Sequence, residues 1–324
     1  MTKILTADLK NIYFAAEMIK KGKVVAFPTE TVYGLGANAF DPKAVSMIFE
    51  AKKRPKFDPL IVHISNYQML EMVAGDLPKD IEKLTQIFWP GPLTVVLPKK
   101  EKIPPITTAG LQTVAVRMPQ HPIALRLISL ADTPIAAPSA NPFGKLSPTS
   151  AEQVYSGLMG KIEIILDGGP TPIGIESTII KQENGEIYLL RPGGISVEDI
   201  EKVLEKKVKE RTIPKIEAPG SFSSHYAPST PLYILKSKKI PEEYFNKKIG
   251  FLAFSSKPEY GKFKKIKILS KKADLKEAAK NFFTYLYELD KENLDLIISE
   301  KVPQKGLGFA IMDRLKKASQ NKFI

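Results

Sequence analysis

A stretch with an apolar run followed directly by polar residues and glycines occupies residues 23–37, KVVAFPTETVYGLGA. Its apolar run at residues 24–27 predicts a short buried strand, which a proline ends. Residues 29–31, Thr-Glu-Thr, then offer side-chain oxygens just past the carboxyl end of that strand, where ligands bind in open α/β sheets. Gly34 and Gly36 allow the backbone to turn sharply or to approach another group closely. The stretch therefore predicts a strand that ends in a polar binding site.

Short apolar runs that alternate with amphipathic stretches predict an α/β fold with a mixed parallel and antiparallel sheet. A helix at 8–21 carries its apolar residues on one face and is followed by Gly22 as a stop signal. A helix at 41–52 begins with Asp-Pro, a capping residue followed by the proline favoured at the first helical position. The other strands expected before residue 207 lie near 60–64, 93–97, 114–118, 134–137, 162–166, 177–180 and 187–190, and the other helices near 78–88, 122–131, 149–158 and 196–206.

The amino-acid composition changes after residue 206, where we expect a first domain at residues 1–206 to end. Residues 207–230 are rich in proline, glycine and serine and show little periodicity, which predicts a linker. Because Phe222, His225 and Tyr226 lie in it, we expect this linker to act as an active-site lid. The alternative is that these aromatic residues dock on the surface of the second domain. Residues 231–324 form a smaller Rossmann-like α/β domain, with strands expected at 232–235, 249–254, 266–269 and 294–299 and helices at 273–289 and from 308.

The net charge bears on the class of partner. The chain has 324 residues, 43% of them hydrophobic, so it can bury a sizeable core. Its formal net charge is +13, and residues 231–324 hold 21 Lys and Arg against 11 Asp and Glu. Only six of the 48 basic residues are Arg, the residue suited to bidentate phosphate contacts. A solvated lysine surface is therefore favoured over a nucleic-acid footprint, which would carry more Arg and aromatic residues.

Several kinds of chemistry are excluded or disfavoured. The absence of cysteine excludes disulfides, thiolate catalysis and cysteine-based zinc sites. The three histidines show no metal-ligand spacing, so no protein-ligated catalytic metal is expected. The sequence has no Ser-His-Asp arrangement with a nucleophile elbow, which argues against a covalent acyl-enzyme intermediate. The sequence has no membrane-length apolar run and no signal-peptide core, so we expect a cytoplasmic protein without membrane contact. An enzyme of this composition would work by positioning and charge neutralisation.

Two pairs of polar residues at element ends are candidates for such work. Lys52 and Arg54 lie at the end of a helix, where their spacing alone favours helix capping on a solvated face. Ser139 and Asn141 follow the strand at 134–137 and again place polar groups at the end of a strand.

Two further candidates lie within expected strands. Arg117 follows the apolar run Val-Ala-Val at 114–116, where it can fork onto a carboxylate or form an edge salt bridge. His63 interrupts an apolar strand, and such a histidine is more often a hydrogen-bonded structural residue than a ligand contact.

Ordered motifs now identify a family. They are PTETVYGLG at 28–36, Lys-x-Arg at 52–54, PLIVHIS at 59–65, Ser-Ala-Asn at 139–141, SPTSA at 147–151, PGSFSSHYAP at 219–228 and GLGFAIMDRLKKA at 306–318. Together these motifs resemble the YrdC-like threonylcarbamoyl-AMP synthases. The last two resemble the long, two-domain form of that family, so the resemblance covers nearly the whole chain.

The resemblance implies a twisted open mixed sheet with a concave cavity, followed by the smaller Rossmann-like domain. It implies an L-threonylcarbamoyladenylate synthase, a nucleotidyltransferase that makes threonylcarbamoyl-AMP and pyrophosphate from L-threonine, bicarbonate and ATP. The product would serve a downstream tRNA threonylcarbamoyl transferase, which modifies tRNA beside the anticodon. Mg²⁺ would be carried by ATP phosphates and water. Contact of the basic C-terminal domain with tRNA is left open and is not favoured.

The resemblance also assigns roles residue by residue. The implied residues are Lys52, Arg54, Ser139 and Asn141 for catalysis, Thr31, His63, Arg117, Ala137 and Ser177 for threonine, and Arg54, Asp58, Thr113, Ser139, Ser147, Arg191 and Tyr226 for ATP, with no metal ligand.

This sequence departs from the family pattern at two places. Asp58 stands where the family usually has Asn, so its carboxylate would face the sugar, pair with a lysine or help a hydrated Mg²⁺. The linker lacks the Lys or Arg that many relatives place before the histidine.

Two other functions are weighed against this one. The first is an RNA-binding module without catalysis, which holds duplex RNA on a concave basic face. The second is the carbamoyl-transfer domain of a hydrogenase-maturation protein. Such chains carry cysteine zinc fingers, and this sequence has no cysteine.

Overall fold

The computed structural model describes residues 1–210, 225–237 and 239–324, which form two compact units. The first unit contains Met1–Phe143, Pro148–Pro172 and the described residues of Glu176–Ser221. The second contains Gly144–Ser147, Ile173–Ile175 and the described residues of Phe222–Ile324. Two short segments from the expected first domain, residues 1–206, thus group with the C-terminal residues, which the expected boundary at residue 206 did not anticipate. Most of the predicted lid, including Phe222, lies outside the described residues.

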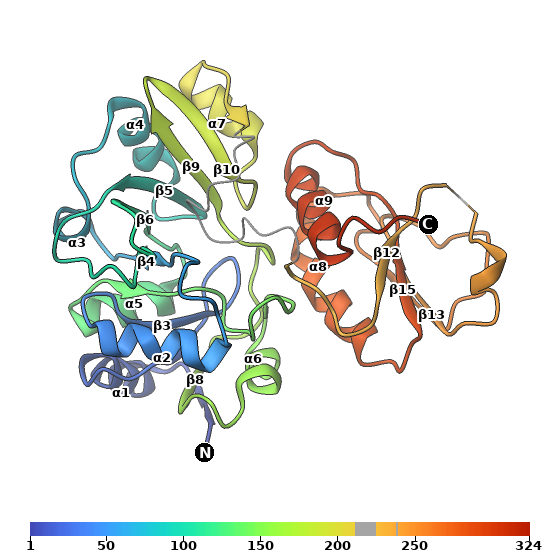
Figure 1. Ribbon diagram of the computed structural model, residues 1–324, viewed down its shortest axis with the longest axis horizontal. Coiled ribbons are helices and arrows are strands. Elements are labelled where there is room, and N and C mark those ends of the chain that lie inside the picture. The colour runs from blue at the N-terminus through green and yellow to red at the C-terminus, as the bar shows by residue number, and fades with distance from the viewer. Residues whose placement is uncertain (211–224, 238) are drawn as a thin grey trace. The chain divides into compact units, whose positions relative to one another are not determined.

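A mixed sheet forms the centre of the first unit, with the strand order β1-β8-β2-β3-β7-β4-β6-β5-β9-β10-β11. The sheet contains parallel pairs such as β4–β6 and β5–β9 together with antiparallel pairs such as β2–β3 and β5–β6 (Figure 1). The predicted mixed α/β sheet is therefore confirmed. The strands are β1 (Lys3–Thr6), β2 (Val25–Phe27), β3 (Gly34–Asn38), β4 (Ile61–His63), β5 (Leu93–Pro98), β6 (Thr113–Arg117), β7 (Ile135–Ala136), β8 (Ile164–Asp167), β9 (Thr178–Glu183), β10 (Glu186–Arg191) and β11 (Lys209–Glu210).

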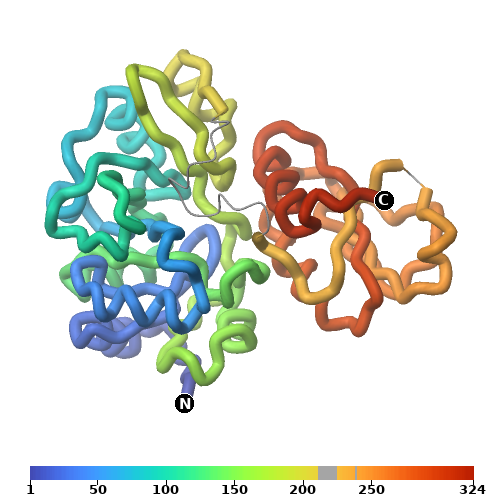
Figure 2. Tube along the Cα trace, in the orientation of Figure 1, coloured from blue at the N-terminus to red at the C-terminus, as the bar shows by residue number. Residues whose placement is uncertain are grey.

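Two pairs of helices pack together in this unit. Helix α1 packs against α5, and α4 packs against α7 beside the hairpin of β9 and β10 (Figure 2). The Asp41 side chain caps α2 by accepting from the backbone N–H groups of Lys43 and Ala44, as its Asp-Pro start predicts. Among the described residues, no helix is long and apolar enough to cross a membrane. The helices of this unit are α1 (Leu9–Lys20), α2 (Pro42–Lys52), α3 (Tyr67–Val73), α4 (Lys79–Phe88), α5 (Pro122–Ala131), α6 (Ala151–Leu158) and α7 (Val197–Leu204).

The glycines of the PTETVYGLG motif lie in strand β3, which the sequence analysis did not predict. A Cβ atom at Gly36 would lie 2.6 Å from both Ile135 Cγ2 and Phe27 Cε1. The glycine therefore serves the close approach of neighbouring side chains, and the sharp turn considered for this position is wrong.

The register of the sheet determines which candidate residues lie next to each other. In the parallel pair β4–β6, His63 lies beside Arg117. Strand β7 runs antiparallel to β4 and leads into Ala137 and Ser139, and Ser139 forms an isolated bridge with Gly34. Polar residues that are far apart in the sequence are thereby gathered at the ends of neighbouring strands.

The second unit has a parallel sheet of four strands in the order β12-β15-β13-β14. Helices α8 and α9 pack against each other, and α8 also packs against β13 and β14. This is the smaller α/β unit that the sequence predicted. Its elements are β12 (Leu232–Ile234), the 3-10 helix η1 (Glu242–Tyr244), β13 (Ile249–Ala253), β14 (Lys265–Ile268), α8 (Leu275–Asp290), β15 (Leu296–Ser299) and α9 (Leu307–Ala318).

Candidate functional site

Lys52 is a buried cation held by the Ser-Ala-Asn motif. Its Nζ donates to the backbone oxygen of Ser139 at 2.5 Å and to that of Asn141. Only 1% of Lys52 is exposed, so it does not cap a helix on a solvated face. Burial, followed by the charge of Arg54, lowers the pKa of Lys52 well below its usual value. The structure therefore brings together three of the residues predicted for catalysis.

Arg54 and Asp58 form a buried ion pair. Arg54 Nη2 lies 2.8 Å from Asp58 Oδ2, and its Nε and Nη2 donate to the backbone oxygens of Asp58 and Pro59. Burial raises the pKa of Asp58, while Arg54, Lys52 and Arg191 oppose that rise. The carboxylate that departs from the family pattern is thus paired with an arginine, whereas a lysine partner was one of the expectations. Three cations surround one carboxylate, which leaves an excess of positive charge suited to phosphate groups.

Arg117 lies at the end of β6 and is only 3% exposed. Its Nη1 donates to Thr31 Oγ1 at 2.9 Å, its Nε donates to Gly91 O at 3.3 Å, and its Nη2 lies 2.6 Å from Glu30 Oε1. The predicted threonine-binding residues Thr31 and Arg117 are therefore bonded to each other. Arg117 does form a salt bridge, but with a buried partner that the sequence analysis did not name.

His63 lies beside this group and is 4% exposed. Burial, followed by the positive charge of Arg117, lowers its pKa to about 3. The imidazole is therefore neutral at neutral pH and adds no charge next to Arg117.

Ser177 and Arg191 lie between the group of Lys52, Arg54 and Asp58 and the group around Arg117. Arg191 donates from Nε and Nη2 to Ser177 O at 3.1 and 2.9 Å, and from Nη2 to Ser177 Oγ at 3.1 Å. Ser177 Oγ also shares a 2.7 Å hydrogen bond with Thr94 Oγ1, a residue that the sequence analysis missed. Because Gly91 binds Arg117 and Thr94 binds Ser177, the segment 91–94 links the Arg117 group to Ser177 and Arg191. The charge of Arg191 in turn acts on Asp58.

The remaining predicted residues are more scattered. Ala137 is buried just after β7, where its N–H donates to Ile61 O, and Thr113 begins β6. Ser147 and Tyr226 are both buried, and both belong to the second unit.

Tyr226 packs within the second unit. Its ring centroid lies 5.7 Å from that of Phe283 on α8, and the guanidinium of Arg314 on α9 lies 5.1 Å from it. The adjacent ring of His225 lies 4.1 Å away. The roles of Tyr226 in ATP binding and of its segment as a lid stay predictions.

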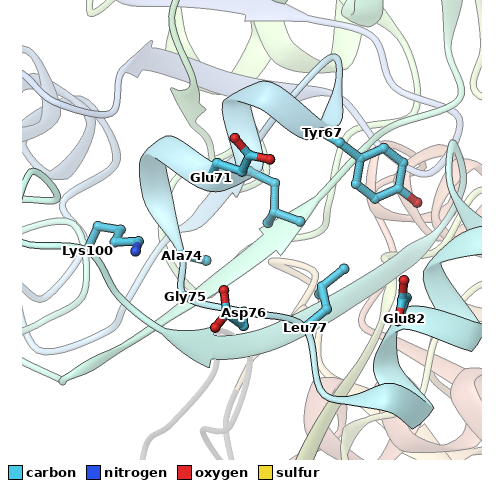
Figure 3. A pocket seen from close by; sticks show the side chains of 9 residues that line it. Tyr67, Glu71, Ala74, Gly75, Asp76, Leu77, Glu82 and Lys100 are labelled. Carbon is cyan, nitrogen blue, oxygen red and sulfur yellow. The ribbon is translucent and has the colours of Figure 1, made fainter.

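A cavity of about 270 Å³ lies elsewhere in the first unit, at α3, residues 74–77 and the start of α4 (Figure 3). Its charged lining consists of Glu71, Asp76, Glu82 and Lys100, and it includes none of the predicted site residues. Within the described parts of the chain, no group of three or more His, Asp or Glu could hold a metal ion.

Comparisons with known proteins agree with these motifs. A family model described as "Telomere recombination" matches residues 17–193, and one described as "Threonylcarbamoyl-AMP synthase, C-terminal domain" matches residues 195–320. The threonylcarbamoyl-AMP synthase of Pyrococcus abyssi is 48% identical to this chain, over 97% of this chain and 95% of its own length. That of Bacillus subtilis is 43% identical, over 100% and 97% of the two chains.

A solved structure gives the same result. The crystal structure of P. abyssi Sua5 complexed with L-threonine superposes with a TM-score of 0.92 and 44% sequence identity, over 100% of this chain and 99% of that one. The chain belongs to the threonylcarbamoyl-AMP synthase family, in its long two-domain form.

Proposed function

We propose that this protein is an L-threonylcarbamoyladenylate synthase that converts L-threonine, bicarbonate and ATP to threonylcarbamoyl-AMP and pyrophosphate. The carrying observation is that hydrogen bonds, the segment 91–94 and the charge interaction of Arg191 with Asp58 connect two buried cationic groups. Arg117 with Thr31 forms one group, and Lys52 and Arg54 with Arg191 form the other. Ser177 lies between them, bonded to Arg191. Two neighbouring anion sites are what a reaction between a carbamate and a triphosphate requires.

The amino-acid half of the site is assigned to the Arg117 group. The guanidinium would bind the α-carboxylate of threonine, with Thr31, neutral His63 and Ser177 around the substrate. Ala137, which is 3% exposed at the end of β7, would add an apolar contact.

The nucleotide half is assigned to the Lys52 and Arg54 group. Lys52, Arg54 and Arg191 would neutralise the triphosphate, and Ser139 and Asn141 fix the position of Lys52. Asp58 balances part of this charge in the free protein, because it is paired with Arg54. Thr113, Ser147 and Tyr226 complete the residues proposed for ATP.

The chemistry follows from these charges. The ammonium group of threonine loses a proton to solvent, and the resulting amine combines with bicarbonate to give the carbamate and water. A carbamate oxygen then forms a bond to the α-phosphorus, the bond to the β,γ-diphosphate breaks, and its electron pair leaves with pyrophosphate. The carbamate is already an anion, so the residues need to align two anions that repel each other more than they need to remove a proton.

Mg²⁺ fits this site as a companion of ATP and not as a resident ion. Asp58 is fully buried and pairs with Arg54, and within the described residues no group of three or more His, Asp or Glu could hold a metal ion. Phosphate oxygens and water would carry the ion, which supplies further charge neutralisation when bound. We place the reaction in the cytoplasm, where ATP and tRNA are present, upstream of a tRNA threonylcarbamoyl transferase.

Pyrophosphate release tests this function against the alternatives. We expect release from the full chain with ATP and Mg²⁺ only when both L-threonine and bicarbonate are present. An RNA-binding module would release no pyrophosphate under any of these conditions. A carbamoyl-transfer domain would require carbamoyl phosphate and would not depend on threonine.

A further inference from the structure

Glu30, in the middle of the Thr-Glu-Thr segment, has no role in the function proposed so far. It follows β2, only 3% of it is exposed, and its Oε1 lies 2.6 Å from Arg117 Nη2. It is thus a buried carboxylate next to the guanidinium that we assign to the α-carboxylate of threonine.

The hydrogen bonds around this pair are incomplete. Among the described residues, neither carboxylate oxygen of Glu30 has a hydrogen-bond partner of acceptable geometry, and neither has Arg117 Nη2. The two side chains are close enough to attract each other, but the N–H groups of Nη2 are not aligned with the carboxylate. By contrast, Arg117 Nε and Nη1 are aligned on Gly91 O and Thr31 Oγ1. One buried donor and two buried acceptors therefore remain for a ligand.

This combination matches the two charged groups of a free amino acid. An α-carboxylate can accept from the unused N–H groups of Arg117, and an α-ammonium group can donate to the unused oxygens of Glu30. Arg117 and Glu30 together carry no net charge, and His63 beside them is neutral at neutral pH. A zwitterion keeps the buried site neutral, whereas a carboxylate without an amine adds an uncompensated negative charge.

We infer that Glu30 binds the α-ammonium group of the amino acid and makes the site select zwitterions over simple carboxylates. This inference rests on the proposed function, because it takes Arg117 as the carboxylate-binding residue. In a simpler role, Glu30 would only hold Arg117 in position and would never touch the substrate.

Calorimetry on the full chain separates these two roles. The ligands are L-threonine and (R)-3-hydroxybutyrate, which keeps the carboxylate, hydroxyl and methyl groups and lacks the amine. We expect the unmodified protein to prefer threonine. In Glu30→Gln, threonine affinity should fall about tenfold to hundredfold, while affinity for (R)-3-hydroxybutyrate stays the same or rises and ATP affinity is unchanged. Glu17→Gln, which removes an exposed carboxylate paired with Lys20, should leave both affinities unchanged.

The outcomes that overturn the inference differ from those that overturn the function. Equal losses for both ligands in Glu30→Gln would show that Glu30 only positions Arg117. Equal binding of both ligands by the unmodified protein would also overturn it, and this needs no variant. If Glu30→Gln does not fold, Glu30→Asp keeps the carboxylate and should retain the preference for threonine. An unmodified protein that binds no threonine at all would contradict the proposed function itself.

Discussion

Arg117 divides its guanidinium group among several partners. Two of its nitrogens bond to Gly91 O and Thr31 Oγ1, and the third lies beside Glu30. These contacts fix the plane of the group before any ligand arrives, so less conformational entropy is lost on binding. The group is thereby preorganised to receive a carboxylate.

Arg117→Ala should weaken threonine binding much more than ATP binding. Loss of the buried partner of a carboxylate costs roughly 2–5 kcal/mol, whereas the groups assigned to ATP are unchanged. Calorimetric titration with each ligand measures the two effects, with Arg126→Ala on the exposed side of α5 as the matched control. Equal losses for threonine and ATP would refute the assignment of Arg117.

The buried His63 should make the protein sensitive to acid. Its pKa falls from 6.5 to about 3 on folding, so below pH 6.5 the unfolded chain binds a proton that the folded chain does not. The neutral form of His63 therefore costs no free energy of unfolding above pH 6.5, and the free energy of unfolding decreases as the pH falls from 6.5 toward 3. At pH 5 the loss amounts to about 2 kcal/mol.

Urea unfolding at pH 7 and pH 5 tests this value. The decrease in unfolding free energy between the two pH values should be smaller in His63→Gln than in the unmodified protein. An equal decrease in both proteins would show that His63 is protonated as readily in the folded state as in the unfolded state.

The end of α2 shows how one element directs two cations inward. Lys53 adopts the left-handed conformation at the C-cap, with φ of 53°, and is exposed. This turn allows Lys52 and Arg54 on either side of it to be buried, against the Ser-Ala-Asn segment and Asp58 respectively. A Lys-Lys-Arg run on a helix end looks solvated from spacing alone, and only the tertiary structure shows the burial.

Elements with a clear periodicity could be predicted from the sequence, and others could not. The helix at 122–131 was predicted with its observed bounds, because its apolar face and its proline start are both strong signals. Strand β3 was missed because its sequence, GLGAN, lacks β-branched and aromatic residues. In the site, motifs located Arg117 and Lys52, and the Thr-Glu-Thr run placed the oxygens of Glu30 at the end of a strand. The pairing of Glu30 with Arg117 and the contact of Thr94 with Ser177 became visible only in the structure.

Gly36→Ala should destabilise the protein by about 1–3 kcal/mol, the usual cost of overpacking a core. The added Cβ would lie 2.6 Å from Ile135 and Phe27, which belong to strands on either side of β3. Gly75→Ala is the control, because its Cβ would meet its nearest neighbour at 3.7 Å. Thermal or urea unfolding that shows no difference between the two variants would contradict this account of β3.

At the scale of the whole molecule, the second unit holds a segment that carries a predicted ATP contact. Gly144 O accepts from Ala227 N–H at 2.8 Å, and Leu146 O accepts from Tyr287 Oη–H at 3.0 Å. Ser147, predicted for ATP, follows directly. Lysines of this unit are largely exposed, and some form surface ion pairs such as that of Lys265 with Glu292, in keeping with a solvated surface.

Tyr287→Phe should therefore weaken ATP binding about twofold to tenfold, the effect of one lost hydrogen bond on a neighbouring contact. Threonine binding should not change, because the residues assigned to it lie in the first unit. Tyr285→Phe, which alters a neighbouring tyrosine whose ring contacts Lys267, is the control. Unchanged ATP affinity in Tyr287→Phe would show that the second unit does not support nucleotide binding through this segment.

The most direct test of the central claim is mass spectrometry of the reaction product. The full chain is incubated with ATP, Mg²⁺, L-threonine and ¹³C-labelled bicarbonate. We expect threonylcarbamoyl-AMP that carries the label, together with pyrophosphate, and loss of this product when threonine or bicarbonate is omitted. The absence of the labelled adenylate, with every component present and the protein folded, would contradict the proposed function.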